Sequence, residues 1–233
     1  FNRMLEQLQA AYQRVAQALD QQRTFVADIA HELRTPLSTL RGNLGLLRRV
    51  PAIPAHERLE VLTDMESESD RMIRLVNDLL TLARAESGRS YARVPLEAVP
   101  LIEDICRRQQ ALYPNRRIRQ AAEPGLVMLG DRDALQQVLL IALDNALKHT
   151  EGDVLVNAHR VEDGVEIRVR DYGPGIEPEH LAHIFDRFYR GELGGAPGYG
   201  LGLAIAKSLM EGQGGHIKME SVPGEGSTLV LRM

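Results

Sequence analysis

Hydrophobic side chains in residues 1–86 recur every three or four positions, a spacing that places them along one side of an α-helix. One long helix is predicted over residues 1–49 and a second over 56–86. Pro51 and Pro54 interrupt the pattern between them, because proline lacks a backbone N–H group. The two helices would form an antiparallel hairpin with two apolar faces. One hairpin cannot cover both faces, so a homodimer with a four-helix bundle is predicted. The apolar positions are Leu5, Leu8, Tyr12, Val15, Leu19, Val26, Ile29, Leu33, Leu37, Leu40, Leu44 and Leu47 in the first helix, and Leu59, Leu62, Met65, Met72, Ile73, Val76, Leu79 and Leu80 in the second.

Residues 87–90 are a short polar linker, and after it helical and alternating patterns follow one another. Asp131 precedes apolar residues at helical spacing, so it is predicted to cap a helix that continues to about Lys148. Strands are predicted at 93–96, 117–121, 126–129, 154–156, 165–169, 216–221 and 227–231, and further helices at 101–112 and 201–211. Glycine-containing turns at 162–164 and 224–226 join neighbouring strands. The sequence therefore predicts a multi-domain protein, an all-α hairpin followed by an α/β sandwich with a mixed sheet and helices on one face.

Composition narrows the possible partners and compartments. The chain has 233 residues, 44% of them hydrophobic, which is enough for one or two ordinary domains. A net charge of −4 and an aromatic content of 4% argue against a nucleic-acid partner. Cys106 is the single cysteine, so there is no internal disulfide and a reducing compartment fits. The sequence contains no apolar run of about 18 residues, so these residues are not expected to span a membrane. The chain opens on Phe1 rather than Met, as expected of a piece of a longer protein.

His31 differs from the apolar positions around it. It lies roughly 200° around the helix from both Ile29 and Leu33, so its imidazole is predicted to point away from the packed side. A neutral imidazole is a nucleophile near neutral pH, and Glu32 could accept the proton of one ring nitrogen. Pro36 cannot donate to the carbonyl group of Glu32, which predicts a bend or loosening one turn after the histidine. Taken alone, a surface histidine on a bundle helix is the more common case.

Three clusters in the second half suit a nucleotide. Asn145 and Lys148 offer an amide oxygen for a hard cation such as Mg²⁺ and an ammonium group for phosphate oxygens. Asp171 follows a strand, where a carboxylate can accept a hydrogen bond from an exocyclic amine, and nearby glycines permit close approach of a ligand. Residues 198–203 open a helix, whose N–H groups can bind phosphate. Each cluster alone also fits a polar helix end, a plain turn or a loop. Their order within one chain favours a nucleotide site.

Five motifs in this order resemble the cytoplasmic core of bacterial two-component sensor histidine kinases. The phospho-acceptor signature of the family is similar to HELRTPL at 31–37, and its asparagine box is similar to NALKHT at 145–150. Its first and second glycine boxes are similar to DYGPGI at 171–176 and GYGLGL at 198–203. Its phenylalanine box, which lies between the two glycine boxes, is similar to IFDRFYR at 184–190. The likeness covers nearly all residues from Phe25 onward, and residues 1–8 are similar to the end of the linker module called HAMP. It implies a signalling helix over 1–24, a dimerisation and histidine phosphotransfer domain over 25–89, and a catalytic ATP-binding domain over 90–233.

The resemblance implies an ATP-dependent protein-histidine kinase with ATP and Mg²⁺ as cofactors. Such a protein phosphorylates His31, passes the phosphoryl group to an aspartate of a response regulator, and also dephosphorylates that partner. Glu32 would be the base for His31, and Thr35 would position water in the phosphatase reaction. Asn145 would hold Mg²⁺, and the implied nucleotide-binding residues are Asn145, Lys148, His149, Asp171, Gly173, Gly175, Ile176, Arg190, Gly198, Gly200, Leu201, Gly202 and Leu203. A mobile lid is implied over 187–198, together with a location as the cytoplasmic portion of an inner-membrane sensor.

Ile141 departs from the family pattern, which has a second asparagine four residues before Asn145. Isoleucine binds neither metal nor phosphate, so a lower affinity for nucleotide or Mg²⁺ is expected. Related ATPases of this nucleotide fold, such as gyrase and the heat-shock chaperones, place a water-activating glutamate there, and Ile141 cannot activate water. Two alternatives stay open: an ATPase of the same fold that leaves His31 unlabelled, and a dimeric signalling scaffold with weakened catalysis.

Overall fold

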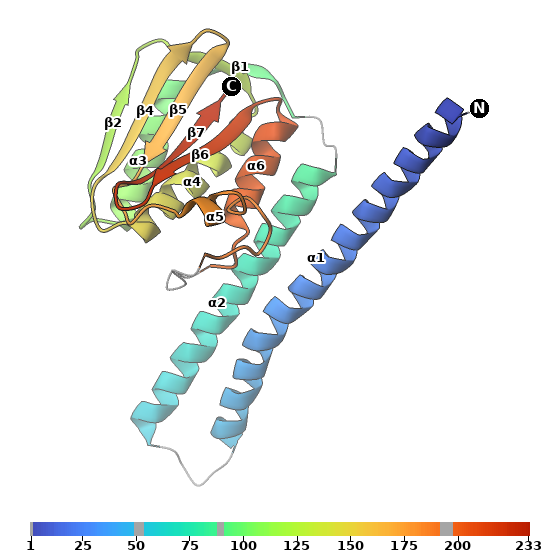
Figure 1. Ribbon diagram of the computed structural model, residues 1–233. Helices are drawn as coiled ribbons and strands as arrows, with labels where there is room; N and C mark the ends of the chain where they lie inside the picture. The colour runs from blue at the N-terminus through green and yellow to red at the C-terminus, as the bar shows by residue number, and fades with distance from the viewer. Residues whose placement is uncertain (1, 49–53, 88–90, 192–197) are drawn as a thin grey trace. The chain divides into compact units, whose positions relative to one another are not determined.

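The computed structural model describes residues 2–48, 54–87, 91–191 and 198–233. The chain divides into two compact units, Phe1–Asn77 and Asp78–Met233. The first unit contains helix α1 (Asn2–Arg48) and most of helix α2 (Ala55–Glu86), whose last turns belong to the second unit. The two helices run in opposite directions, so both predicted helices of the hairpin are confirmed (Figure 1). Among the described helices, none combines the length and the apolar character needed to cross a bilayer.

Helix α1 continues through Pro36 without interruption. The ring of Pro36 is buried, and its missing N–H removes one hydrogen bond from the helix. The loosening expected at this turn stays a prediction.

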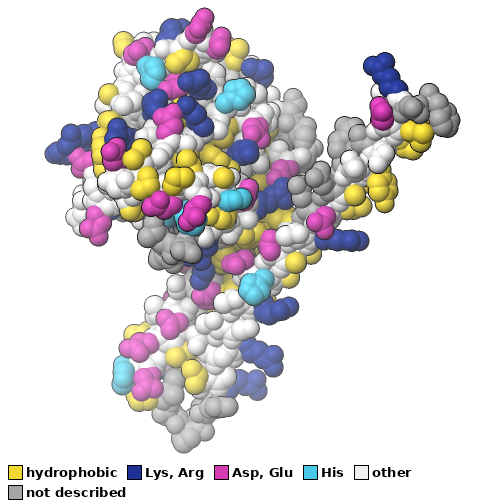
Figure 2. Space-filling view, viewed as in Figure 1, with side chains coloured by type: hydrophobic (Ala, Val, Ile, Leu, Met, Phe, Trp, Pro, Cys, Tyr) yellow, Lys and Arg dark blue, Asp and Glu magenta, His cyan; other side chains and the backbone are white. Residues whose placement is uncertain are grey.

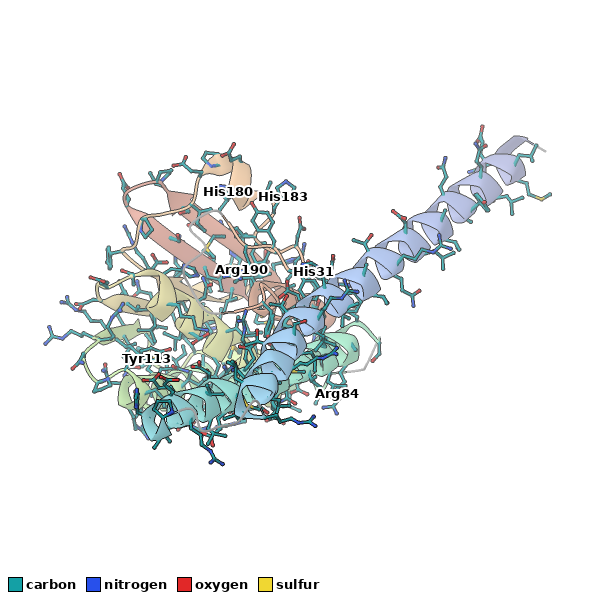
Figure 3. The ribbon with its side chains drawn as sticks, turned by 90° about the horizontal axis from the view of Figure 1, so that it is seen from below. His31, Arg84, Tyr113, His180, His183 and Arg190 are labelled. Carbon is teal, nitrogen blue, oxygen red and sulfur yellow. The ribbon has the colours of Figure 1, made fainter. Side chains whose placement is uncertain are left out.

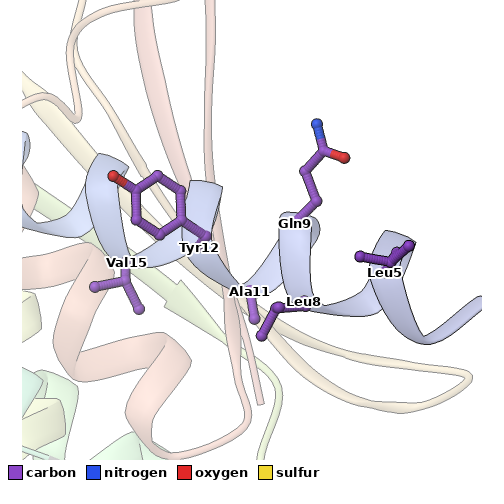
Figure 4. Close-up of a pocket in the computed structure, with 6 residues that line it drawn as sticks. All are labelled: Leu5, Leu8, Gln9, Ala11, Tyr12 and Val15. Atoms are coloured by element: carbon purple, nitrogen blue, oxygen red, sulfur yellow. The ribbon is translucent and has the colours of Figure 1, made fainter.

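The apolar stripe of α1 is partly covered and partly exposed. Ile29 and Leu33 are half-buried, whereas Val26 and Leu37 are 58% and 52% exposed. Near the N-terminus, six side chains line an open hollow of about 550 Å³ along the helix (Figure 4). They are Leu5, Leu8, Gln9, Ala11, Tyr12 and Val15. Leu8 and Tyr12 in this row are 68% and 75% exposed.

The second unit is built on a five-stranded sheet with strand order β2-β4-β5-β7-β6. Its strands are β2 (Ile118–Ala122), β4 (Val154–Val161), β5 (Gly164–Arg170), β6 (His216–Val222) and β7 (Gly226–Arg232). Strand β2 pairs in parallel with β4, and the other pairs are antiparallel, which confirms the predicted mixed sheet. Strands β1 (Val94–Glu97) and β3 (Val127–Gly130) form a separate antiparallel pair. The neighbouring strands predicted at 117–121 and 126–129 therefore lie in different sheets.

Three helices cover one face of the large sheet: α3 (Ala98–Leu112), α4 (Arg132–His149) and α6 (Gly202–Gly212) (Figure 1). Helix α4 packs against both α3 and α6. Successive strand residues point to opposite faces, so every second residue of the strands joins the core under the helices. Fully buried members of this core are Leu101, Ile102, Ile105, Leu135, Leu139, Leu143, Ile167, Leu201 and Ile205. The short helix α5 (Pro178–Leu181) was not predicted, because four residues give too little periodic pattern to recognise.

The opposite face of the sheet carries a network of charged side chains. Glu166 on β5 is only 2% exposed, and its carboxylate accepts hydrogen bonds from Arg168 at 3.0 Å and from Arg232 at 2.5 Å. Arg168 also pairs with Glu220 on β6, which in turn contacts Lys218 at 2.5 Å. Figure 2 shows basic and acidic side chains intermingled over this face. Burial of Glu166 opposes its ionisation, but the arginine hydrogen bonds prevail and lower its pKa.

Candidate functional site

Helix α4 carries the asparagine motif and begins at a side-chain cap, as predicted. Oδ1 of Asp131 accepts hydrogen bonds from the backbone N–H groups of Asp133 and Ala134, both at 3.1 Å. The backbone N–H of Asp131 donates to Oε1 of the buried Gln213, 2.7 Å away. These bonds fix the start of α4, and with it the direction in which the last turn presents Asn145.

Asp171 follows β5 and is the most buried ionisable side chain among the predicted site residues, at 6% exposure. Its Oδ1 accepts hydrogen bonds from the backbone N–H groups of Gly173 at 2.9 Å and Ser227 at 3.2 Å. Oδ2 accepts no hydrogen bond from the residues that the structure describes. Burial raises the pKa of this carboxyl, and the two backbone hydrogen bonds partly oppose the shift. A fixed carboxylate oxygen therefore remains for a hydrogen-bond donor on a ligand.

Glycines let the loop after β5 lie close to its neighbours. A Cβ atom at Gly173 would overlap the carbonyl oxygen of His149 at the end of α4. Gly175 has a φ of +74°, and a Cβ atom there would overlap the carbonyl oxygen of Val222 on β6. The loop 171–176 is thus held against the end of α4 on one side and against β6 on the other. This places the asparagine motif and the first glycine motif beside each other, as the sequence predicts.

The last turns of α4 present three predicted ligand-binding side chains. Asn145 is half-buried, and its amide makes no hydrogen bond with other described residues. The Nζ atom of Lys148 lies 2.6 Å from Oδ2 of Asp144, and the hydroxyl group of Tyr113 donates to Oδ1 of the same carboxylate at 3.3 Å. Desolvation lowers the pKa of His149, and the nearby Asp171 carboxylate partly opposes this effect. The neutral ring is therefore favoured near neutral pH, which suits a side chain that contacts a ligand through its face.

An open polar hollow of about 570 Å³ lies beside this end of α4. Residues 148–152, residues 172–174 and Arg116 line it. Arg116 donates to the carbonyl oxygen of Thr150 and, at 3.2 Å, to that of Gly152, so it fixes the chain just after α4. The Arg170 guanidinium lies 4.9 Å from the centre of the Tyr172 ring and orients that exposed side chain at the rim. Sequence reasoning missed Arg116 and Tyr113, because neither stands in a recognisable motif.

The second glycine motif leads into α6. Leu201 precedes this helix and is buried, and it provides no side-chain cap, so ligands can meet the first backbone N–H groups of α6. Gly200 has a φ of +69°, and a Cβ atom there would overlap the carbonyl oxygen of Tyr189. A Cβ atom on Gly202 would lie 3.4 Å from Cγ2 of Ile141, so an apolar side chain of α4 faces the start of α6. The structure thus brings the asparagine motif and the second glycine motif together.

The segment between the two glycine motifs contains residues that the sequence did not single out. Nδ1 of His180 lies 2.6 Å from the hydroxyl oxygen of Tyr189, and Nδ1 of His183 lies 2.8 Å from Oδ2 of Asp186. Figure 3 shows His180 and His183 close together, with the predicted phosphate ligand Arg190 in the same segment. Arg190 and Gly198 are exposed, and Ile176 and Leu203 are half-buried. The predicted lid over 187–198 falls partly on residues 192–197, which lie outside the described residues.

The predicted phospho-acceptor lies in the first unit. His31 is exposed on α1, as its position on the helix predicts (Figure 3). Glu32 is half-buried and Thr35 is exposed. No hydrogen bond joins the His31 ring to the Glu32 carboxylate among the described residues. The imidazole is accessible to a reactant.

Two family descriptions match the two parts of the chain in the order seen in the structure. Residues 21–88 match the His Kinase A (phospho-acceptor) domain. Residues 130–233 match the histidine kinase-, DNA gyrase B- and HSP90-like ATPase family. The chain belongs to the sensor histidine kinase family.

Curated histidine kinases resemble the chain over almost all of its length. The sensor histidine kinase YkoH of Bacillus subtilis is 30% identical over 100% of this chain and 50% of its own. The probable sensor histidine kinase TcrY of Mycobacterium tuberculosis is 36% identical over 96% of this chain and 48% of its own. The histidine-protein kinase/phosphatase MprB of Mycolicibacterium paratuberculosis is 33% identical over 95% and 44%. The chain thus spans about half the length of the curated kinases it matches.

Solved histidine kinase structures share the fold. Full-length ShkA, crystallised in complex with AMPPNP, is 32% identical with a TM-score of 0.66 over 88% of this chain and 44% of its own. The histidine kinase ThkA, in complex with the response regulator protein TrrA, has a TM-score of 0.74 over 90% of this chain and 60% of its own, at 20% identity. The fold predicted from the sequence, a helical hairpin followed by an α/β ATP-binding domain, is therefore confirmed.

Proposed function

We propose that this chain is the working core of a sensor histidine kinase, which phosphorylates His31 with ATP and passes the phosphoryl group to an aspartate of a response regulator. The observation that carries the proposal is an exposed His31 within the region that matches the phospho-acceptor family. The proposed division of labour is a signalling helix over 1–24, a dimerisation and phosphotransfer domain over 25–89, and an ATP-binding domain over 90–233. Phosphoryl transfer depends on placement and charge neutralisation, so a nucleotide pocket and an accessible imidazole are the parts it requires.

The residues of the second unit fit an adenine nucleotide. Oδ2 of Asp171 has no hydrogen-bond donor among the described residues, although the carboxylate is buried and fixed through Oδ1. An exocyclic amine of adenine would supply that donor. Gly175 and Gly200 have positive φ and lie against backbone carbonyl oxygens, so they fix the course of the two loops that would surround the base and phosphates. The base or sugar would contact His149, Ile176, Leu201 and Leu203. The pocket would be shaped by Gly173, Gly198 and Gly202.

The phosphate groups would meet cationic side chains and the start of α6. Lys148 and Arg190 are the proposed phosphate contacts, and the uncapped N–H groups after Leu201 add further donors. The amide oxygen of Asn145 would bind Mg²⁺. Within the described residues no cluster of three or more His, Cys, Asp or Glu side chains could hold a metal by itself. That donor set suits Mg²⁺, which binds mainly to water and substrate phosphates and neutralises their charge.

In the first unit, we assign Glu32 as the base that accepts a proton from His31. The half-buried Glu32 precedes the exposed Thr35 by one turn, so the two side chains lie on neighbouring parts of the helix surface. Thr35 would orient water when the protein removes the phosphoryl group from its regulator. The name of the similar MprB, a kinase/phosphatase, supports this second activity.

A homodimer is the proposed assembly. Leu8 and Tyr12 of α1 are 68% and 75% exposed, and Leu59 of α2 is 66% exposed. A second copy of the hairpin would cover these side chains in a four-helix bundle. We further propose that the partner is a response regulator receiver domain and that the chain is the cytoplasmic portion of an inner-membrane sensor protein.

Incubation with γ-labelled ATP and Mg²⁺ tests the proposal. The wild type should take up label that is acid-labile and base-stable, and His31→Gln should take up none. His56→Gln is the matched control, because His56 is another exposed histidine of the hairpin, and it should be labelled like the wild type. Label that persists in His31→Gln contradicts the assigned acceptor. Steady release of phosphate without label would indicate the ATPase alternative, and neither label nor phosphate release would indicate the scaffold.

A further inference from the structure

The ammonium group of Lys148 is already paired in this structure. Its Nζ atom lies 2.6 Å from Oδ2 of Asp144, one helical turn earlier on α4. The Lys148 and Asp144 side chains are 32% and 41% exposed, so water screens the pair only in part. A residue proposed to bind phosphate is therefore held by a carboxylate of its own helix.

A second residue fixes that carboxylate from another element. Tyr113, which follows α3, donates its hydroxyl proton to Oδ1 of Asp144 at 3.3 Å. Asp144 thus has one oxygen on the tyrosine and the other on the lysine. Burial and the neighbouring carboxylate raise the pKa of Tyr113, so the hydroxyl keeps its proton and remains a donor. Through Asp144, Tyr113 thus holds the ammonium group of Lys148 toward the end of α3.

We propose that Asp144, supported by Tyr113, is a positioning residue that competes with nucleotide phosphates for Lys148 and thereby lowers the affinity for ATP. The inference rests on the proposed nucleotide site. A phosphate oxygen that reaches Lys148 must displace the Asp144 carboxylate or share the ammonium group with it. In both cases the carboxylate lies near the anionic ligand and repels it. Removal of the carboxylate charge releases the lysine and ends the repulsion, so both effects act in the same direction.

The expected effect is modest because the pair is partly exposed. Exposed ion pairs contribute only a fraction of a kilocalorie per mole, which corresponds to an increase in affinity of up to about fivefold for Asp144→Asn. Tyr113→Phe removes only the support of the carboxylate, so its effect should have the same sign and be smaller. Adenosine carries no phosphate, and its affinity should not change.

Glu151 provides a matched control for general electrostatics. It lines the same hollow as Lys148 and is exposed, and it forms no ion pair with other described residues. Glu151→Gln makes the same charge change as Asp144→Asn without touching the lysine. A specific effect of Asp144 should be absent in this variant.

The experiment measures dissociation constants of ATP and adenosine by calorimetry or ligand NMR, with Mg²⁺ and again with a chelator. The variants are Asp144→Asn, Glu151→Gln, Lys148→Met and the double variant Asp144→Asn/Lys148→Met. We expect tighter ATP binding for Asp144→Asn alone and weaker binding for Lys148→Met. Adding Asp144→Asn to Lys148→Met should give a smaller gain than in the wild type, because only the repulsion of the phosphates is then removed. Circular dichroism checks that each variant is folded.

Several results would overturn the inference while leaving the ATP site intact. Unchanged or weaker ATP binding in Asp144→Asn contradicts it, and weakening confined to Mg²⁺ would assign Asp144 to the metal. An equal gain in ATP affinity in Glu151→Gln would show that the effect comes from the loss of any nearby negative charge rather than from Asp144. An equal gain in the Lys148→Met background would show that Asp144 does not act through the lysine. If the wild type binds no ATP, the proposed function itself fails.

Discussion

Replacing Asp171 with asparagine tests the proposed contact with adenine. In the structure Oδ1 is held by two backbone N–H groups, at 2.9 Å from Gly173 and 3.2 Å from Ser227. An asparagine that keeps these two bonds must place its amide oxygen at the Oδ1 position. Its NH₂ group then takes the place of Oδ2, where a hydrogen-bond acceptor is required. A donor would face the exocyclic amine of adenine, which is also a donor.

The expected loss of affinity follows from the hydrogen bond removed. A hydrogen bond to a charged group contributes about 1.5–3 kcal/mol, so ATP should bind about 10- to 150-fold more weakly to Asp171→Asn. Guanine has a carbonyl oxygen where adenine has its amine, and the asparagine NH₂ group can donate to that oxygen. The affinity for GTP should therefore fall less than that for ATP, or rise.

The folded state should tolerate this change. Burial raises the pKa of Asp171 in the folded protein, so the folded state binds more protons than the unfolded state between the ordinary and the raised pKa. The free energy of unfolding of the wild type should thus fall as the pH rises through that range. Asp171→Asn lacks this fall, and near neutral pH it should be at least as stable as the wild type. A loss of nucleotide binding would then not result from unfolding.

Calorimetric titration with ATP and with GTP, combined with urea unfolding at several pH values, measures each of these quantities. The assignment of Asp171 to the base would be refuted if ATP and GTP lost affinity equally, or if ATP bound as tightly as to the wild type. A large loss of stability near neutral pH would refute the reasoning from the pKa shift.

Three further predictions concern the ATP-binding domain. Gly224→Ala meets no atom within 4 Å but adopts φ +83°, and should lower the free energy of unfolding by about 1–2 kcal/mol. Gly175→Ala should cost about 1–3 kcal/mol more because it also overlaps a backbone carbonyl group. Equal urea midpoints for the two variants would contradict that geometry. Glu166→Gln should lower the free energy of unfolding by about 1–3 kcal/mol near neutral pH. The difference in the free energy of unfolding between wild type and Glu166→Gln should shrink as the pH falls through the lowered pKa of Glu166, because the wild type then loses the stability that its ionised carboxylate provides. A difference in urea unfolding that does not change with pH would argue against the arginine contacts. Burial raises the pKa of Cys106 to about 11, so a thiol reagent should label it slowly at pH 8 and rapidly in urea, and equal rates would show an accessible thiol.

Local patterns were enough to predict most elements of the fold. The Asp131 cap was visible because an N-cap depends on residues two or three positions away. The turn before Gly164 was visible because it joins adjacent strands. Pairings between distant segments were not visible. Strand β3 pairs with β1 rather than with β2, and nothing in the neighbouring residues specifies that choice.

The candidate site divides in the same way. Asp171 and Asn145 stand in motifs, and their nearness to each other was expected. The hydrogen bond from Ser227 to Asp171 spans 56 positions of the sequence, and that from Tyr113 to Asp144 spans 31. Neither could be read from spacing. The burial of Glu166 was equally hidden, because its arginine partners come together only when β5 and β7 pair.

Mapping the phosphoryl group onto the chain is the most direct test of the proposed kinase activity. The wild type would be incubated with ATP and Mg²⁺, digested under neutral or alkaline conditions that preserve phosphohistidine, and sequenced by tandem mass spectrometry. The phosphoryl group should be found on the imidazole of His31. Phosphate on a different residue, or an unmodified His31 peptide after ATP has demonstrably bound, would contradict the account.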